Sequence, residues 1–198
     1  MSMPLSETNT NLIPLDLSRF FEVHPVLETE RLILRPITLA DAQNVYEYAS
    51  DPEVAKYMIF PTHTSIADSI KWLENVPDEF ARKERINFAI TQKPDEKFIG
   101  ACSFHHISVE HRRIEIGYVL NRKYWGTGYM TEAVREMIRF AFEELQMHRV
   151  AATCDLDNVR STRVMERCGM ALEGTLRDYE FRHGKFVSTM TYAILNRN

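Results

Sequence analysis

The clearest hydrophobic pattern in the chain covers residues 130–145. Apolar side chains recur there at spacings of three and four, and charged side chains such as Glu132, Arg135 and Arg139 occupy the other face. This period is typical of an amphipathic helix with one buried stripe, so the pattern predicts a helix to about residue 145. Phe140 lies off the stripe, whose members are Met130, Ala133, Val134, Met137, Ile138, Ala141, Phe142 and Leu145.

A short glycine loop, Gly126-Thr127-Gly128, opens this helix. Strand-like stretches precede it at 114–120 and follow the helix at 148–154. This order forms a βαβ unit, which predicts two parallel strands with a right-handed crossover. Glycine lets a backbone approach a ligand closely, and the first amides of a helix lack partners within the helix. The loop is therefore expected to hold phosphate oxygens, with an ordinary glycine turn as the alternative reading.

Helical and strand periods alternate along the rest of the chain. Helices are expected after Thr38, after Thr64 or Ser65, and from Val159. Pro77 is expected to end or kink the second of these helices near residue 76. A spacing of two, as at Ile86, Phe88 and Ile90, indicates strands. The remaining predicted strands are 31–35, 86–91, 98–105, 113–120, 171–181 and 186–195.

The element order is β-α-α-β-β-β-α-β-α-β-β. It predicts an α/β (α+β) fold with a mixed, mostly antiparallel sheet and helices on both faces. We expect one domain over residues 28–198. Residues 1–27 are polar with scattered prolines, which predicts an N-terminal arm whose segment 17–21 docks on the domain.

Composition narrows the class of protein. The formal net charge of −4 argues against a general nucleic-acid binder. No apolar run approaches the ~20 residues that cross a bilayer, and no basic leader precedes an apolar stretch, so we expect a cytoplasmic protein without membrane contact. Three widely spaced cysteines are expected to be reduced thiols. His105, His106 and His111 are expected to be exposed residues of a hairpin and not a metal site, because no cysteine lies at zinc-ligand spacing.

Several ordered motifs resemble the GNAT superfamily of N-acetyltransferases over residues 28–196. The opening segment 28–35 is similar to that of the ribosomal-protein N-acetyltransferase branch. Lys123 departs from the arginine or glutamine usual in the family's loop; it keeps the positive charge but lacks the planar fork of arginine. The other matching residues are Trp125, Gly126, Thr127, Gly128, Tyr129, Thr131, Glu132, Ala133, Asn158, Ser161, Glu166 and Gly169.

The resemblance implies a GNAT fold in which the fourth and fifth strands splay apart and acetyl-CoA lies in the gap. It implies no metal. Asn158 would hold the pantetheine arm, with a helix N-cap as the alternative role. Arg122 and Arg160 are further candidates for phosphate contacts. The implied cofactor-binding residues are Ile116, Gly117, Tyr118, Lys123, Tyr124, Trp125, Gly126, Thr127, Gly128, Tyr129 and Asn158.

A thioester is already activated, so transfer to an amine needs a base and an acid but no covalent enzyme intermediate. Similarity to the ribosomal branch makes Ser161 the acid that protonates the thiolate, and a helix-packing serine is the alternative. The same similarity makes Glu180 the base, unless it is a surface glutamate. Glu115 is the rival base. Glu132 is weaker, because a carboxylate in a first helical turn also favours the helix dipole.

The acceptor stays open at this stage. The resemblance implies the N-terminal amine of a protein or peptide, a small amine as the second class, and a non-catalytic acyl-CoA sensor as the third. Dimers occur in the resembling branch, so a homodimer is a further expectation. Aromatic and methionine side chains around the first two helices are expected to shape the acceptor pocket, namely Tyr46, Tyr48, Tyr57, Met58, Phe60 and Trp72.

Overall fold

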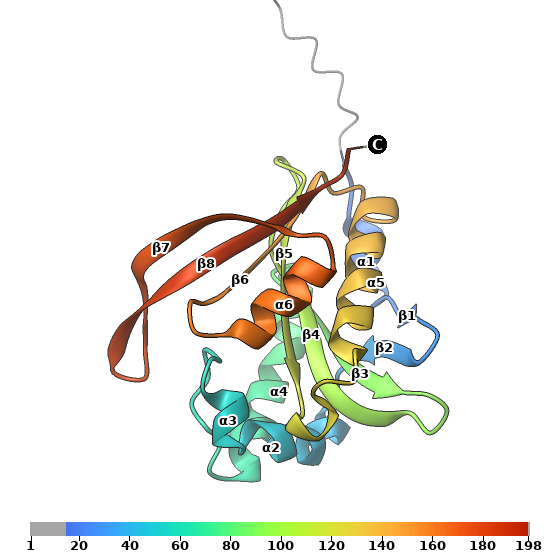
Figure 1. Cartoon of the computed structure of the whole chain (residues 1–198). Helices are drawn as coiled ribbons and strands as arrows, with labels where there is room; N and C mark the ends of the chain where they lie inside the picture. Colours follow the sequence, from blue (N-terminus) through green and yellow to red (C-terminus); the bar gives the residue numbers. More distant parts are fainter. Residues whose placement is uncertain (1–14, 198) are drawn as a thin grey trace, which may run out of the picture.

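One mixed sheet organises residues 15–197, the part of the chain that the computed structural model describes (Figure 1). Neighbouring strands are antiparallel throughout, except for the parallel pair β5–β6. This arrangement confirms the predicted fold class and the parallel βαβ unit. In spatial order the strands are β1 (Leu27–Glu28), β2 (Leu32–Pro36), β3 (Ile86–Gln92), β4 (Lys97–Ser108), β5 (Arg113–Leu120), β6 (Arg149–Asp155), β8 (Lys185–Leu195) and β7 (Ala171–Arg182).

Helices cover both faces of the sheet and create two core clusters. Phe88 belongs to the cluster beneath α5, whereas its neighbour Ala89 belongs to the cluster beneath α2 and α4. Successive strand residues point to opposite faces, so one strand serves both cores. The helices are α1 (Ser18–Glu22), α2 (Ala42–Ala49), α3 (Pro52–Ala55), α4 (Ile66–Ala81), α5 (Tyr129–Glu143) and α6 (Val159–Arg167), with 3₁₀ turns η1 (Leu39–Asp41) and η2 (Arg122–Tyr124).

The parallel strands β5 and β6 stay together for only three residues. Their pairing joins 113–115 to 149–151, after which β6 remains paired with β8 as far as Asp155. The segment 116–120 of β5 is therefore left without a strand partner on that edge. This divergence confirms the predicted splay, and it opens a gap lined by main-chain groups that a ligand can use.

Two sequence predictions near the helices were wrong. Helix α4 continues past Pro77 to Ala81. Its apolar face extends to Phe80, which stacks on His24, so packing outweighs the one backbone hydrogen bond that proline removes. No helix was expected between the first two predicted helices, but α3 begins there at Pro52, and the Asp51 side chain accepts a hydrogen bond from the Glu53 amide.

The chain before β1 packs on the domain. Leu17 is buried in the α5 core, and Phe20 meets Phe140 edge to face. Phe140 is therefore buried although it lies off the helical stripe. The first fourteen residues of the expected arm lie outside the described part of the chain. Among the described helices, none has the length and apolar character needed to cross a membrane.

Candidate active site

The glycine loop after β5 has a backbone that only glycine adopts easily. Gly126 and Gly128 have φ angles of 79° and 84°, and Gly128 is the N-cap of α5. Side chains fix the loop from both sides: buried Asn121 accepts a hydrogen bond from the Lys123 amide at 3.1 Å. The Thr127 hydroxyl donates to the Tyr124 carbonyl at 2.6 Å. A Cβ at Gly126 would meet no atom within 4 Å, so the loop faces open space that a ligand can enter.

A cavity of about 370 Å³ lies between this loop, the unpaired end of β5 and α6. It contains several predicted cofactor-binding residues: Tyr118, Tyr124, Trp125, Gly126, Gly128 and Asn158. Ile116 and Gly117 line a second cavity instead. Thr127 and Tyr129 line neither of these cavities, and the Tyr129 hydroxyl accepts a hydrogen bond from Gln92 at 2.6 Å.

Two of the predicted cations are already paired. Lys123 bonds to Glu47, and the Arg122 Nε atom lies 3.0 Å from an Asp51 carboxylate oxygen. Arg160 instead lies over the Trp125 ring at 4.5 Å from its centroid and lines the first cavity. The positive charge at this cavity therefore comes from α6 and not from the loop.

Two arginines on α6 join Arg160 at the first cavity and were missed from the sequence. Arg163 and Arg167 lie three and seven residues after Arg160, so the three share one helix face. Within residues 15–197, neither Arg160 nor Arg163 is paired with a carboxylate. Their spacing was visible in the sequence, but only the fold shows that this face meets a cavity. Unpaired guanidinium groups there suit phosphate oxygens.

Ser161 and Tyr118 meet beside the part of β5 that has diverged from β6. The Ser161 hydroxyl lies 2.8 Å from the Tyr118 hydroxyl, and both residues line both cavities. Asn158 caps α6, because its side-chain oxygen accepts a hydrogen bond from the Ser161 amide at 3.2 Å. Burial raises the pKa of Tyr118 above its usual value of 10.0. At neutral pH this junction therefore presents two protonated hydroxyls.

The second cavity, of about 280 Å³, lies on the other side of that junction. Five of the six residues expected to shape an acceptor pocket line it: Tyr48, Tyr57, Met58, Phe60 and Trp72. Tyr46 does not line it, and its hydroxyl donates to the Thr64 carbonyl at 3.4 Å. The two cavities share Tyr57, Met58, Tyr118, Val119, Asn158 and Ser161. The two cavities therefore adjoin at Ser161 and Tyr118.

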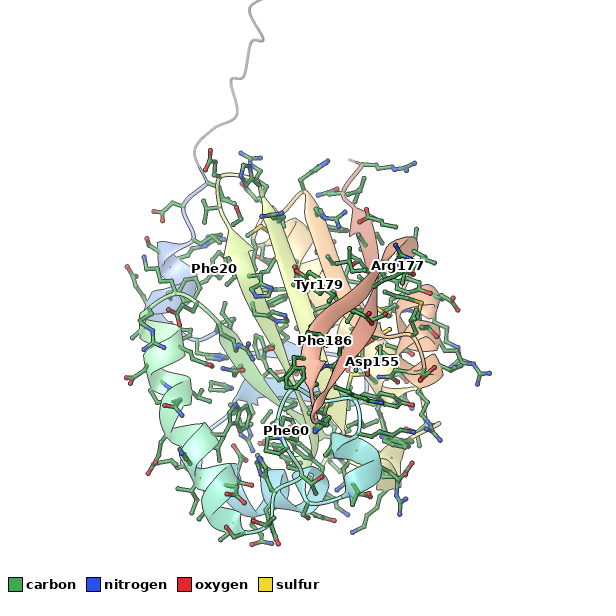
Figure 2. The ribbon with its side chains drawn as sticks, turned by 90° about the vertical axis from the view of Figure 1, so that its left-hand side faces the viewer. Phe20, Phe60, Asp155, Arg177, Tyr179 and Phe186 are labelled. Atoms are coloured by element: carbon green, nitrogen blue, oxygen red, sulfur yellow. The ribbon has the colours of Figure 1, made fainter. Side chains whose placement is uncertain are left out.

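Glu180 lies on β7 and lines neither of these cavities. Its carboxylate pairs with the Arg182 Nε atom at 2.8 Å. Arg182, which is half-buried, also bonds to Asp155 and donates to the Tyr57 carbonyl at 2.8 Å. Figure 2 views this side of the molecule and labels Asp155 on β6 and Tyr179 on β7. Glu180 is therefore bound into a network beside the acceptor cavity and not directed into it.

The other two carboxylates have different surroundings. Glu115 lies 3.9 Å from the Nε2 atom of His105 and 3.2 Å from the Nδ1 atom of His106. Glu132 accepts hydrogen bonds from the Thr29 hydroxyl at 2.5 Å and from the Arg31 amide at 2.9 Å. Burial alone would raise the pKa of Glu132, but these bonds more than offset it and hold the pKa below 4.5. Glu132 therefore fastens the segment before β2 to α5.

His105 is a further cavity residue whose surroundings differ from the sequence prediction. The prediction of an exposed side chain holds for His106 and His111 but is wrong for His105, whose side chain is 19% exposed and lines the second cavity. His105 shares a sheet face with Ser103 and with Gly117 on the neighbouring strand, as the strand register requires. The only sequence signal was this alternation, which does not reveal the cavity.

Comparison with known proteins identifies the family of this chain. Residues 31–171 match the family model described as acetyltransferase (GNAT) domain. The chain is 35% identical over 171 residues to the uncharacterized N-acetyltransferase p20 of Bacillus licheniformis, covering 86% of this chain and 96% of that one. It is 26% identical over 147 residues to the ribosomal-protein-serine acetyltransferase of Escherichia coli, covering 69% and 82%.

A solved structure shows that the whole fold is shared. The crystal structure of a GNAT-family acetyltransferase from Bacillus anthracis superposes with a TM-score of 0.78 at 30% identity, covering 86% of this chain and 98% of that one. The splayed parallel strands, the glycine loop and the family match agree with one another. The chain therefore belongs to the GNAT family of acetyltransferases and is an acetyl-CoA-dependent N-acetyltransferase.

Proposed function

We propose that this chain acetylates the N-terminal α-amine of a protein or peptide by direct attack of the amine on the acetyl-CoA thioester. The observation that carries the proposal is the meeting of two cavities at Ser161 and Tyr118. One cavity suits the cofactor and the other an amine. The relationship to a ribosomal-protein-serine acetyltransferase supports an α-amine as the acceptor.

Acetyl-CoA occupies the first cavity. Its pyrophosphate binds the amides around 126–128 at the start of α5, and Arg160 and Arg163 add positive charge. The pantetheine arm runs between the splayed strands, where main-chain groups of 116–118 have no strand partner. Asn158 holds this arm in addition to capping α6.

Ser161 protonates the departing thiolate. Its hydroxyl lies at the junction of the cavities, 2.8 Å from the Tyr118 hydroxyl, which can return a proton to it. The amine nitrogen forms a bond to the thioester carbon, the carbon–sulfur bond breaks, and the thiolate takes the Ser161 proton. The amine loses one proton to a base, so the proton count balances once base and serine exchange protons with water.

Glu180 and Glu115 are the carboxylates proposed as base. Neither lines the acceptor cavity, so each needs an intervening group or water to reach the amine. If Glu180 is the base, its replacement by glutamine lowers kcat while the acetyl-CoA affinity stays unchanged. Glu115→Gln is the matched comparison. A kcat that stays at the wild-type value in Glu180→Gln at saturating substrates would remove Glu180 as the base.

A small amine is the second candidate acceptor. The observation that favours it is the modest size of the acceptor cavity, about 280 Å³, and its aromatic lining. A non-catalytic acyl-CoA sensor is the third reading, but a sensor has no need of a hydroxyl pair at the junction.

The deciding experiment measures CoA release from acetyl-CoA with a panel of free-N-terminus peptides, N-terminally blocked peptides, polyamines and amino-acid amides. We expect release with the free peptides and none with their blocked counterparts. Release with small amines alone would favour the second candidate. Tight acetyl-CoA binding without release from any amine would favour the sensor and contradict the proposal.

A further inference from the structure

His105 has a ring nitrogen that the fold leaves unsatisfied. Its Nδ1 atom is enclosed by protein and makes no hydrogen bond of normal geometry with any residue in the described part of the chain, although the Ser103 main chain lies close enough to the ring to oppose the lowering of its pKa. An unpaired buried polar atom costs about 1–3 kcal/mol, so its presence calls for a physical reason. The ring belongs to the wall of the acceptor cavity, which also contains Ser161 and Tyr118.

The unsatisfied edge of the ring faces Gly117. A Cβ built on Gly117 would lie 3.2 Å from the His105 Cε1 atom and 3.6 Å from Nδ1. Gly117 lies in the part of β5 that has lost its parallel partner, where the thioester is proposed to bind. The absence of a side chain at residue 117 therefore lets the imidazole pack closely against the β5 backbone, in the wall of the second cavity.

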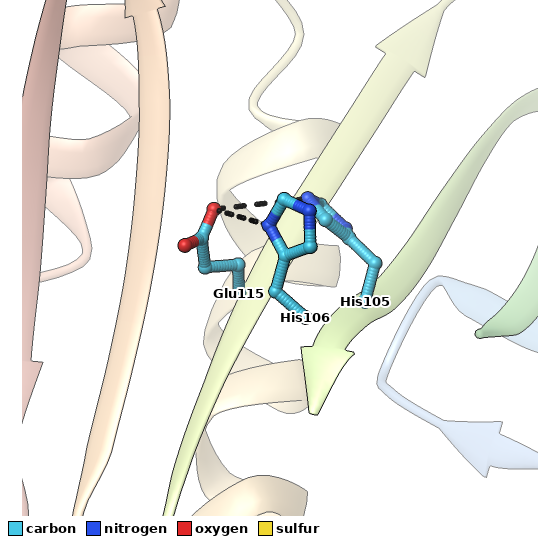
Figure 3. A group of neighbouring side chains, drawn as sticks. All are labelled: His105, His106 and Glu115. Carbon is cyan, nitrogen blue, oxygen red and sulfur yellow. Dashed lines mark ion pairs between the residues drawn. The ribbon is translucent and has the colours of Figure 1, made fainter. Parts of the chain in front are cut away.

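The opposite edge of the ring faces a carboxylate. Glu115 lies directly across from His105 in the antiparallel register of β4 and β5, with 3.9 Å between Nε2 and the nearest carboxylate oxygen (Figure 3). This negative charge favours the proton on Nε2 and leaves Nδ1 as a proton acceptor. A β-bulge between His105 and Ser108 turns the next residue, His106, toward the same carboxylate, but His106 is exposed and does not line the cavity.

We propose that His105 is the general base that takes the proton from the acceptor amine, and that Glu115 is the positioning residue that orients its ring. This inference rests on the proposed function, and it supplies the group through which a carboxylate outside the cavity acts on the amine. His105 Nδ1, which the ring must turn toward the cavity to expose, accepts the proton directly or through one water as the nitrogen–carbon bond forms. The imidazolium returns the proton to solvent after the carbon–sulfur bond has broken and Ser161 has protonated the thiolate.

The protonation state of the ring suits this role. Burial, with smaller contributions from the charges of Arg85 and His106, lowers the pKa of His105 to about 4. The imidazole is therefore neutral at pH 7 and free to accept a proton. The amine becomes a much stronger acid once it has attacked the carbonyl, so a weak base suffices, and the charge on Glu115 stabilises the imidazolium that forms.

The kinetic test uses the full chain with acetyl-CoA and a hexapeptide that has a free N-terminal serine. We expect His105→Gln to lower kcat about 100-fold, within the range usual for a lost general base, with an unchanged affinity for acetyl-CoA in calorimetry. Glu115→Gln should lower kcat about 10-fold at unchanged KM. His106→Gln is the matched control, since His106 contacts the same carboxylate outside the cavity, and its kcat should stay within about twofold of wild type. Free imidazole should restore part of the activity of His105→Gly.

A wild-type kcat in His105→Gln, or equal losses in the His105 and His106 variants, would overturn the proposal. If His105→Gln binds acetyl-CoA poorly, the Glu115→Gln variant, at a partly exposed position, provides the test instead. An unchanged kcat in Glu115→Gln would then reject His105 and Glu115 as base and positioning residue. Nitrogen NMR of the wild-type ring gives an answer without turnover: we expect a proton on Nε2 and none on Nδ1, and the opposite tautomer contradicts the inference. Absence of wild-type turnover with every amine would reject the proposed function separately.

Discussion

The Ser161 hydroxyl has surroundings that its neighbours along α6 do not share. Its hydroxyl meets the Tyr118 hydroxyl at 2.8 Å, whereas the Thr162 hydroxyl donates to the Val159 carbonyl of its own helix. A hydroxyl bonded to its own backbone has no proton available for a substrate, but the Ser161 hydroxyl lies at the junction of two cavities. Adjacent residues of similar chemistry therefore differ in their surroundings, because only Ser161 lines the cavities.

We expect Ser161→Ala to lower kcat about 100-fold, because the thiolate loses its proton donor. The affinity for acetyl-CoA should stay near the wild-type value in calorimetry. Thr162→Ala removes a hydroxyl one residue away and should leave kcat unchanged. Equal effects of the two substitutions would show that Ser161 acts only through the packing of α6.

Asp41 acts on stability and not on chemistry. Its carboxylate accepts two hydrogen bonds from Arg35, at 2.7 and 2.9 Å, and caps the turn before α2 through the Thr38 amide. Burial alone would raise the pKa of Asp41, but these bonds more than offset it and hold the pKa below 3.8. The ionised form therefore stabilises the folded chain at neutral pH.

Asp41→Asn is expected to lower the free energy of unfolding by about 2 kcal/mol at pH 7, through the lost ion pair and cap. The folded-state pKa is lowered, so this stabilisation is present above pH 3.8 and disappears as the pH falls through the folded-state value. Urea denaturation from pH 7 to pH 3 should show a constant gap between the two proteins at first and a narrowing gap below about pH 4. A difference in the free energy of unfolding between the two proteins that does not change with pH would contradict the lowered pKa of Asp41.

At the scale of the elements, the glycine loop and α6 line the first cavity, the proposed cofactor site, from opposite sides. Gly126 supplies a left-handed backbone in open space, and α6 supplies three arginines on one face. Gly184, in the turn between β7 and β8, has the same left-handed φ of 79° and the same open surroundings. Substitutions at these two glycines therefore distinguish the cost of backbone strain from the loss of ligand contact.

We expect Gly126→Val to weaken acetyl-CoA binding at least 10-fold in calorimetry, because a branched side chain strains the loop and crowds the phosphate site. Gly184→Val carries a similar backbone cost away from the cavity. It should lower the melting temperature by a similar amount and leave the acetyl-CoA affinity unchanged. Wild-type affinity in Gly126→Val would rule out the loop as the phosphate site.

At the scale of the whole molecule, Arg182 ties the β7–β8 hairpin to the rest of the domain. Its side chain is 10% exposed and bonds to Asp155 on β6, to Glu180 on β7 and to the carbonyl of Tyr57. Tyr57 also lines both cavities. The hairpin, which otherwise reaches away from the sheet (Figure 1), is therefore coupled to the wall of the acceptor cavity.

Arg182→Gln is expected to reduce the free energy of unfolding by about 3 kcal/mol, because two carboxylates lose a buried partner. The KM for the peptide acceptor should rise as the Tyr57 segment loosens, whereas the acetyl-CoA affinity should change little. Arg149→Gln is the matched control: Arg149 pairs with the more exposed Glu173, so its loss should cost less than about 1 kcal/mol. Equal stability losses in the two variants would contradict the larger contribution of Arg182 to stability.

The sequence by itself determined the features that depend on neighbouring residues. The stripe of α5, the left-handed glycines of the loop and the cap at Asn158 follow from backbone geometry, which repeats every few residues. The motifs around 125–131 and 158–169 also determined the family, because local backbone shape is what binds the cofactor.

The tertiary structure alone decided which side chains line the two cavities. The sequence placed His105 in an exposed hairpin and gave Glu180 the base position, yet His105 lines the acceptor cavity and Glu180 is held by Arg182 outside it. Phe140 and the continuation of α4 past Pro77 were missed for the same reason. The splay of β5 from β6, the register across β4 and β5, and the hairpin contact with Tyr57 join residues far apart in the chain. Packing between elements that are distant in the sequence determines such contacts, and a local hydrophobic pattern does not predict them.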